Sequence, residues 1–412
     1  MPLNGSEMFF PNGFLWGAGT SAHQVEGNNI NNDWWAWEQE GRVSQRSGLA
    51  CDHYHRYADD LRLAASLGLN AYRFSVEWSR IEPRPGVYAQ AELDHYRNVV
   101  ATCRSNGLEP LVTLHHFTLP QWLARQGGWL ADGVADRFAA YVAQVVAALE
   151  VTYWATINEP EVLLVRGYLE GSWPPGDRSL IHAFAAFRAM VEAHQKAVQA
   201  IRQIRPQARL GVIQNWIHFE PLRSRHLGDR LICAVHRAAF DHAFLNQTAA
   251  SCDWIGINYY SRNWSRCSVV HPRQCFMPLP ARDGERTTMM GWSVYPPGIR
   301  AALHEVAMRY GKPLYVTENG IATTDDRWRI AYIEAHLAQL AQAIHEGVDI
   351  RGYFHWSLLD NFEWAEGFRP RFGLVAVDYA TQRRTPRPSA YYLGRMATAN
   401  RWLPAPAMSY SN

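Results

Sequence analysis

Short runs rich in β-branched and aromatic residues alternate with longer segments of helical periodicity along most of this 412-residue chain. Such runs are typical of buried strands, and the segments between them are long enough for helices. We predict eight strands, near Phe14–Gly17, Ala71–Trp78, Glu109–His116, Tyr153–Glu159, Arg209–Trp216, Trp254–Tyr260, Leu314–Glu318 and Ile350–Ser357. The predicted helices are His53–Leu67, Ala91–Ser105, Val134–Leu149, His182–Ile204, Pro297–Tyr310, Trp328–His345 and Ser389–Ala399.

Eight strand–helix units in one chain predict an α/β fold, a single (β/α)₈ TIM barrel with its active site at the C-terminal ends of the strands. We assign residues 1–412 to one (β/α)₈ catalytic domain, with residues 403–412 as a candidate flexible tail. A doubly wound sheet also alternates strands and helices, but it gathers its site at one crevice instead of at many strand ends. The longest irregular insert is expected at Ser261–Pro296.

Composition excludes several classes of protein. With 48% hydrophobic residues, 19% charged residues and a formal charge of +2, the chain has no basic excess to attract nucleic acid. It contains no uncharged apolar run of about 18 residues and no signal-like N-terminal pattern, so we expect a cytoplasmic protein with no membrane partner. Six cysteines without paired C-x-x-C spacing are expected to be free thiols.

Aromatic residues are abundant, with seventeen Trp and nineteen Tyr. Their flat faces and polar tips suit the binding of sugar rings, which stack through C–H groups and form hydrogen bonds through hydroxyls. A large aromatic core is the alternative explanation.

Two glutamates stand where predicted strands end. Glu159 lies in "TINEP" and Glu318 in "YVTENG". A pair of carboxyl groups at the active face of a barrel fits glycoside hydrolysis, in which one acid protonates the leaving oxygen and the other carboxylate attacks or activates water. Burial and like-charge repulsion would keep one protonated and leave the other ionised. For either glutamate alone, a helix cap or an ion pair with arginine is the alternative.

Other motifs compete with this pair. Glu77 in "VEWSR" is a third strand-end acid, for which its neighbour Arg80 favours an ion pair. The segment "GAGTSA" matches a dinucleotide-binding pattern, but Gly- and Asn-rich sequence follows where that motif needs a helix. We therefore expect no dinucleotide cofactor.

A metal site is the other alternative, because "CDHYH" supplies Cys51, His53 and His55 and "HH" supplies His115 and His116, residue types that bind metals. No H-E-x-x-H or paired C-x-x-C supports a metal, and hydrogen-bonded histidines are the simpler interpretation. We expect no metal. A G-x-S-x-G elbow and a P-loop are also absent from the sequence.

Ordered motifs over nearly the whole chain resemble glycoside hydrolase family 1, the β-glucosidase-like barrels. They are "FLWGAGTSAHQVEG", "YRFSVEWSRIEP", "LVTLHHFTLPQWL", "TINEP", "WIGINYY", "YVTENG", "HWSLLDNFEWAEGF" and "RFGLVAVDY". The resemblance implies a retaining exo-β-glycosidase that hydrolyses terminal non-reducing β-D-glucosyl residues through a covalent glycosyl-enzyme. β-Galactosides and β-fucosides are further candidate substrates, and no cofactor is implied.

The same resemblance implies a role for individual residues. Glu159 would be the acid/base and Glu318 the nucleophile, with Arg73 and Tyr260 flanking the nucleophile. The residues that match sugar-binding positions are Gln24, His116, Asn158, Trp356, Glu363 and Trp364.

Two regions of the sequence bear on the choice of leaving group and of sugar. The segment Asp229–Asp253 looks shorter than is usual in the family, which leaves the leaving-group pocket undefined. Relatives that act on 6-phosphoglycosides place Ser, Lys and Tyr where this chain has Glu363, Pro370 and Phe372, so we expect an unphosphorylated sugar. A mainly transglycosylating enzyme and a non-catalytic sugar-binding barrel are the alternative functions.

Overall fold

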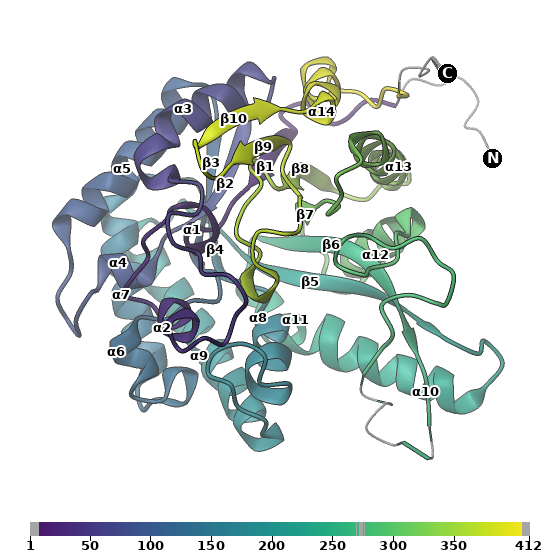
Figure 1. The fold of residues 1–412 in the computed structure, drawn as a ribbon, viewed down its shortest axis with the longest axis horizontal. Helices are drawn as coiled ribbons and strands as arrows, with labels where there is room; N and C mark the ends of the chain where they lie inside the picture. Colours follow the sequence, from purple (N-terminus) through teal and green to yellow (C-terminus); the bar gives the residue numbers. More distant parts are fainter. Residues whose placement is uncertain (1–7, 269, 272–274, 276, 406–412) are drawn as a thin grey trace.

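The computed structural model describes residues 8–405 except 269, 272–274 and 276. Eight parallel strands form a closed barrel in sequence order, and the last strand pairs with the first (Figure 1). They are β1 Leu15–Gly19, β2 Ala71–Ser75, β3 Glu109–His115, β4 Tyr153–Asn158, β5 Arg209–Pro221, β6 Trp254–Ser265, β7 Leu314–Asn319 and β8 Ile350–Trp356. The predicted (β/α)₈ barrel is confirmed.

Helices surround the barrel (Figure 1). The long ones are α3 His53–Ser66, α5 Gln90–Ser105, α7 Val134–Ala148, α9 Leu180–Ile204, α12 Pro296–Tyr310, α13 Asp326–His345 and the closing α14 Pro388–Ala399. The short ones are α1 Ala22–Val25, α2 Asp33–Gln39, α4 Trp78–Ile81, α6 Gln121–Ala124, α8 Pro160–Leu163, α10 Leu227–His236 and α11 Ala243–Thr248. Single turns of 3₁₀ or π helix are Gly128–Leu130, Leu164–Leu169, Arg237–His242, Ala249–Ser251 and Trp364–Glu366.

Helix α7 illustrates how local sequence places these helices. Its residues Val134, Phe138, Tyr141, Val142 and Val145 recur at spacings of three or four and are all buried. That spacing puts them on one face of the helix, which packs on the barrel and leaves the polar face outside. The amphipathic pattern seen in the sequence therefore sets the orientation of the helix.

The lower interior of the barrel is filled by one buried side chain from each of seven strands: Ala71, Leu111, Ala155, Ile213, Trp254, Tyr315 and Phe354. Large rings need small neighbours at this level. A Cβ on Gly211 would approach the Trp254 ring to 2.4 Å, and one on Gly17 would approach the Phe354 ring to 2.4 Å. This packed apolar layer closes the barrel from below and leaves polar groups above it at the strand C-termini.

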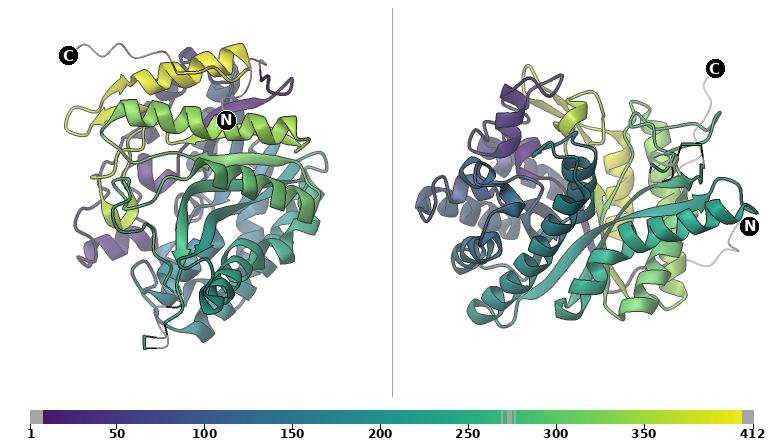
Figure 2. Two further views of the ribbon diagram at one scale, coloured as in Figure 1. Left: turned by 90° about the vertical axis from the view of Figure 1, so that its right-hand side faces the viewer. Right: turned by 90° about the horizontal axis from the view of Figure 1, so that it is seen from below.

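Strands β5 and β6 are longer than predicted and reach beyond the barrel (Figure 2). They continue to pair with each other past His218 and Arg262, as far as Pro221 and Ser265. The predicted irregular insert Ser261–Pro296 therefore begins with regular strand, a difference that arises because each extension supplies the other with hydrogen-bond partners. Residues 269, 272–274 and 276 of that insert lie outside the described part of the chain.

The loop after β8 is held against the barrel by a small hairpin that the sequence did not predict. Its strands are β9 Val375–Asp378 and β10 Arg383–Pro386. Arg384 of β10 donates to both carboxylate oxygens of Asp60 on α3, at 2.8 and 3.0 Å. Arg387 donates likewise to Asp360 within the loop, at 3.0 and 2.7 Å. These paired contacts fix the segment that carries Glu363 and Trp364.

Two further sequence predictions concern the chain as a whole. All six cysteines are free. In the described part of the chain, no helix is both long and apolar enough to cross a membrane. Most of the predicted tail 403–412 lies outside the described residues, which end at 405.

Candidate active site

A buried arginine organises the polar layer above the apolar interior. Arg73 on β2 is fully buried and only donates hydrogen bonds. Its guanidinium reaches Glu318 Oε1 at 2.5 Å, the Thr317 carbonyl at 3.2 Å, Asn158 Oδ1 at 2.6 Å and Thr113 Oγ1 at 3.3 Å. The carboxylate of Glu318 and these neutral acceptors offset the cost of burying the charge.

Glu318 lies within β7 and has a donor at each oxygen. The Arg73 guanidinium donates to Oε1, and the Tyr260 hydroxyl from β6 donates to Oε2. Burial and the charge of Glu318 raise the pKa of the Tyr260 hydroxyl, so it remains a donor. The two donors hold the carboxylate in one orientation.

Glu159 follows β4 directly and lies in different surroundings. Its backbone is left-handed, with φ 44°, a conformation that costs a non-glycine residue energy and is common at functional sites. Pro160 then begins α8. Burial first, and then the negative charge of Glu318, raise the pKa of Glu159 well above its usual range. This carboxyl group therefore favours its protonated form at neutral pH.

Asn258 on β6 forms hydrogen bonds with residues at the ends of both β4 and β7, the strands that precede or carry the two glutamates. It was not predicted from the sequence. Its amide donates to Glu159 Oε1 at 2.8 Å and to Asn158 Oδ1 at 3.2 Å. The Thr317 hydroxyl donates to its carbonyl oxygen at 2.7 Å. Because side chains alternate along a strand, a residue two positions before Tyr260 faces the same interior. That period of two was the available signal for Asn258.

Gln24 and Glu363, both predicted to bind sugar, lie together. Gln24 Nε2 donates to Glu363 Oε2 at 3.2 Å and to the Phe362 carbonyl at 2.9 Å. Asn361 Nδ2 donates to the same Glu363 oxygen at 2.9 Å. Burial raises the pKa of Glu363 to about 8. The two side chains form a cluster of donors and acceptors beside the charged pair.

His116, Trp356 and Trp364 form a stack of rings on the same side of the site. The imidazole lies 5.9 Å from the Trp356 ring and 6.3 Å from the Trp364 ring, nearly parallel to both at 16°. Burial and the charge of Arg73 lower the pKa of His116 well below its usual range, so it stays neutral. Its Nε2 lies 3.4 Å from Asn158 Nδ2 and can accept from that amide. Eight of the ten predicted site residues are thus linked by side-chain contacts, while Gln24 and Glu363 pair with each other and Glu363 feels the charge of Glu318.

The third strand-end acid, Glu77, belongs to another network, and its predicted ion pair with Arg80 is wrong. Glu77 caps α4 by accepting from Ser79, and the Thr118 hydroxyl donates to both of its oxygens. Arg80 instead donates to Glu26 at 2.8 Å. Helix α4 begins directly after Glu77, which turns the two side chains toward different neighbours.

The residues of the alternative metal site go to separate partners. Cys51 donates to the Asp360 carbonyl, His53 contacts Asp60, and His55 contacts Asp52 near the surface. His115 packs edge-on against the Trp129 ring. Within the described residues, no group of three His, Cys, Asp or Glu side chains is placed to hold a metal ion.

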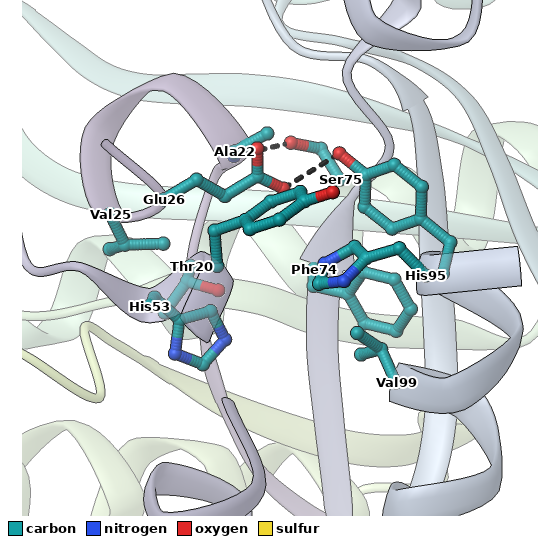
Figure 3. A pocket seen from close by; sticks show the side chains of 11 residues that line it. Thr20, Ala22, Val25, Glu26, His53, Phe74, Ser75, His95 and Val99 are labelled. Carbon is teal, nitrogen blue, oxygen red and sulfur yellow. Dashed lines mark hydrogen bonds between the residues drawn. The ribbon is translucent and has the colours of Figure 1, made fainter. Parts of the chain in front are cut away.

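A separate cavity lies outside the barrel wall, between α1, α3, α5 and β2 (Figure 3). Glu26, His53 and His95 line it together with apolar side chains such as Val25 and Phe74. Its volume is about 10 Å³, which is room for about one water molecule. It is too small for a substrate.

Comparison with known proteins agrees with this geometry. The model of glycosyl hydrolase family 1 matches residues 6–246 and 232–402. Beta-glucosidase A from Thermotoga maritima is 34% identical, with 95% of this chain and 98% of the relative covered. A beta-galactosidase from Pyrococcus woesei is 31% identical, with 95% and 97% covered.

Solved structures give the same result. A beta-glycosidase from Pyrococcus horikoshii superimposes with a TM-score of 0.92 at 41% identity, with 97% of each chain covered. A beta-glucosidase from Thermotoga maritima in complex with glucoimidazole has a TM-score of 0.89 at 33% identity, with 95% of this chain and 99% of that chain covered. These matches define the protein as a glycoside hydrolase of the β-glucosidase type. The chain belongs to glycosyl hydrolase family 1.

Proposed function

We propose that this protein is a retaining exo-β-glycosidase that acts on terminal non-reducing β-D-glucosyl residues. The observation that carries the proposal is the contrast between its two glutamates. Glu318 accepts hydrogen bonds from a cation and a hydroxyl, as a carboxylate nucleophile must, whereas burial favours the protonated form of Glu159. A carboxyl group held by two donors and a second one that favours its protonated form would supply the two roles that glycoside hydrolysis needs.

The reaction follows from these roles in two steps. Glu318 attacks the anomeric carbon while the bond to the leaving oxygen breaks, and Glu159 transfers its proton to that oxygen. The resulting glycosyl ester on Glu318 is then attacked by water, whose proton returns to Glu159, and the ester bond breaks. Retention through this path requires the two carboxyl groups to lie about 5 to 5.5 Å apart.

The predicted binding residues suit a neutral sugar. Gln24 and Glu363 offer donors and acceptors for hydroxyl groups, and Trp356 and Trp364 offer an apolar surface for the ring. Asn158, whose Oδ1 accepts from Arg73, would bond the 2-hydroxyl. A family member named a beta-galactosidase supports β-galactosides as further substrates, because such enzymes accept the other orientation of the 4-hydroxyl.

The sugar is expected to be unphosphorylated. Arg369 is 58% exposed and pairs with Glu366 at 3.2 Å. Arg371 is partly buried and lies 3.5 Å from Asp360. Both guanidiniums thus lie beside a carboxylate, although Arg371 shares Asp360 with Arg387. A 6-phosphate would face the Glu363 carboxyl group without a free cation from this pair. We expect an aryl β-glucoside to be a far better substrate than its 6-phosphate, measured by kcat/KM.

The test of the mechanism is the configuration of the first product. Proton NMR of an aryl β-glucoside reaction is expected to show the β-anomer of glucose before mutarotation. An initial α-anomer would remove Glu318 as nucleophile. The same reaction at rising acceptor sugar measures the transglycosylating alternative, and a complete lack of turnover would favour a sugar-binding barrel.

A further inference from the structure

The hydrogen bonds around Asn258 have a direction that is set by Arg73. A guanidinium can only donate, so the contact of 2.6 Å identifies the Asn158 atom facing Arg73 as the carbonyl oxygen. The same oxygen lies 3.2 Å from the Asn258 amide, which must therefore present its nitrogen. The second N–H of that nitrogen is then directed to Glu159 Oε1, at 2.8 Å.

The other side of the amide is held by one hydroxyl. The carbonyl oxygen of Asn258 accepts from Thr317 Oγ1 at 2.7 Å, and both side chains are fully buried. All three hydrogen-bonding groups of the Asn258 amide are thus partnered. A flipped amide would place its oxygen against Asn158 Oδ1, which can only accept, and would take the N–H away from Glu159, which is unfavourable in a buried site.

We propose that Thr317 is a positioning residue for the acid/base: its hydroxyl holds the Asn258 amide so that an N–H faces Glu159. The inference rests on the proposed role of Glu159. In the second step Glu159 must accept a proton from water, and an N–H aimed at its carboxylate stabilises the form that does so. Thr317 touches no reacting atom and acts only through Asn258.

Charged and titratable groups from several elements also act on Glu159. Burial and Glu318 favour its protonated form, and the Asn258 amide is the main neutral donor that opposes them. The surrounding groups are Glu318 on β7, Arg73 on β2, Tyr260 on β6, Glu161 on α8 and Glu363 in the loop after β8. Because a Thr317 variant leaves every one of them in place, a shifted pH profile reports the hydrogen bond itself.

The test is the alkaline limb of the pH profile of kcat/KM with an aryl β-glucoside of poor leaving group. A hydrogen bond is worth about 0.5–1.5 kcal/mol, which corresponds to about 0.4–1 pH unit. Thr317→Val is expected to move the alkaline limb to higher pH by that amount, because the ionised form of Glu159 loses a well-placed donor. Thr317→Ser keeps a hydroxyl at this position, so its alkaline limb is expected to lie at the same pH as in the wild type.

Thr156→Val is the matched control. Thr156 is an equally buried threonine three residues before Glu159, but its hydroxyl contacts His194 outside the barrel, at 2.7 Å. This variant loses a buried hydroxyl without changing the Asn258 amide, so its alkaline limb is expected to stay in place even if its melting temperature falls. A shift equal to that of Thr317→Val would mean that loss of packing, not positioning, moves the limb.

A double-mutant cycle with Asn258→Ser separates positioning from an independent effect. Asn258→Ser removes the amide, so adding Thr317→Val to it is expected to shift the limb no further. Additive shifts, or an unmoved limb in Thr317→Val, would overturn the proposal. If Thr317→Val does not fold, Thr317→Ala takes its place in the same cycle. The anomer formed by the wild-type enzyme tests the proposed function separately, since it does not depend on Thr317.

Discussion

The ends of strands β4 and β7 carry the same residue type in opposite surroundings. Glu318 is still within β7 and accepts from the Arg73 guanidinium and the Tyr260 hydroxyl. Glu159 lies just past β4 in a left-handed conformation and accepts from the neutral Asn258 amide. A cation and a hydroxyl hold the first carboxyl group, whereas burial and the charge of Glu318 raise the pKa of the second against the opposing Asn258 amide. Their surroundings, not their residue type, therefore distinguish the two glutamates.

The largest expected effect comes from removing the carboxylate on the β7 side. Glu318→Gln keeps the shape of the side chain but removes the proposed nucleophile, so kcat for an aryl β-glucoside is expected to fall by about 10⁴-fold or more. The measurement is steady-state turnover, with circular dichroism to confirm folding. Retention of more than about a tenth of the activity would place the nucleophile elsewhere.

The next effect concerns the β4 side and depends on the leaving group. Glu159→Gln cannot donate a proton, so substrates with poor leaving groups are expected to lose about 10²–10⁴-fold in kcat/KM, and activated ones far less. Since the pKa of Glu159 is raised, the wild type is expected to stay active until this group ionises at alkaline pH. The variant has no group to ionise and is expected to lose that alkaline limb. Equal losses across a leaving-group series would contradict the assignment.

A smaller effect is expected from the hydroxyl on the β7 side. Tyr260→Phe removes a donor to a carboxylate, worth about 1.5–3 kcal/mol, so kcat is expected to fall by about 10–100-fold with little change in KM. Tyr259→Phe is the matched control, because the Tyr259 hydroxyl donates to the Tyr295 carbonyl at 2.7 Å and not to Glu318. Comparable kcat losses in both variants would show that Tyr260 has no special role at the site.

The smallest catalytic effect is expected at the third strand-end acid. Glu77→Ala leaves Ser79 and Thr118 without their buried acceptor and is expected to lower the free energy of unfolding by about 1–3 kcal/mol. Because Glu77 contacts neither Glu159 nor Glu318, the dependence of kcat/KM on the leaving group is expected to stay as in the wild type. Denaturant unfolding and the leaving-group series measure the two quantities on one preparation. A changed leaving-group dependence would bring Glu77 into the chemistry.

Most of the barrel could be predicted from local patterns, and the differences have local causes. Strand β2 ends at Ser75 instead of Trp78 because Glu77 caps the helix that follows. Strand β5 continues to Pro221 because β6 pairs with it beyond the barrel. Hairpin β9–β10 was missed because each of its strands has only four residues, too few to show a period.

The two glutamates were found from the sequence because each follows an apolar run, and a parallel barrel gathers such positions at one face. Asn258 and Thr317 were not found, since nothing in their local sequence distinguishes them from other interior strand residues. Their importance comes from a contact between β6 and β7 that brings a hydroxyl to 2.7 Å from an amide.

The sequence by itself determined the alternation of strands and helices, the places where strands end and the acids that stand there. Periodicity and strand ends are properties of neighbouring residues, so they can be read along the chain. Only the tertiary structure decided which acid meets Arg73, 245 residues before Glu318, and which meets Asn258, 99 residues after Glu159. Closing the barrel creates these contacts and buries the two carboxyl groups, and burial in a medium of low polarity raises the pKa of Glu159 while the Asn258 amide opposes the rise.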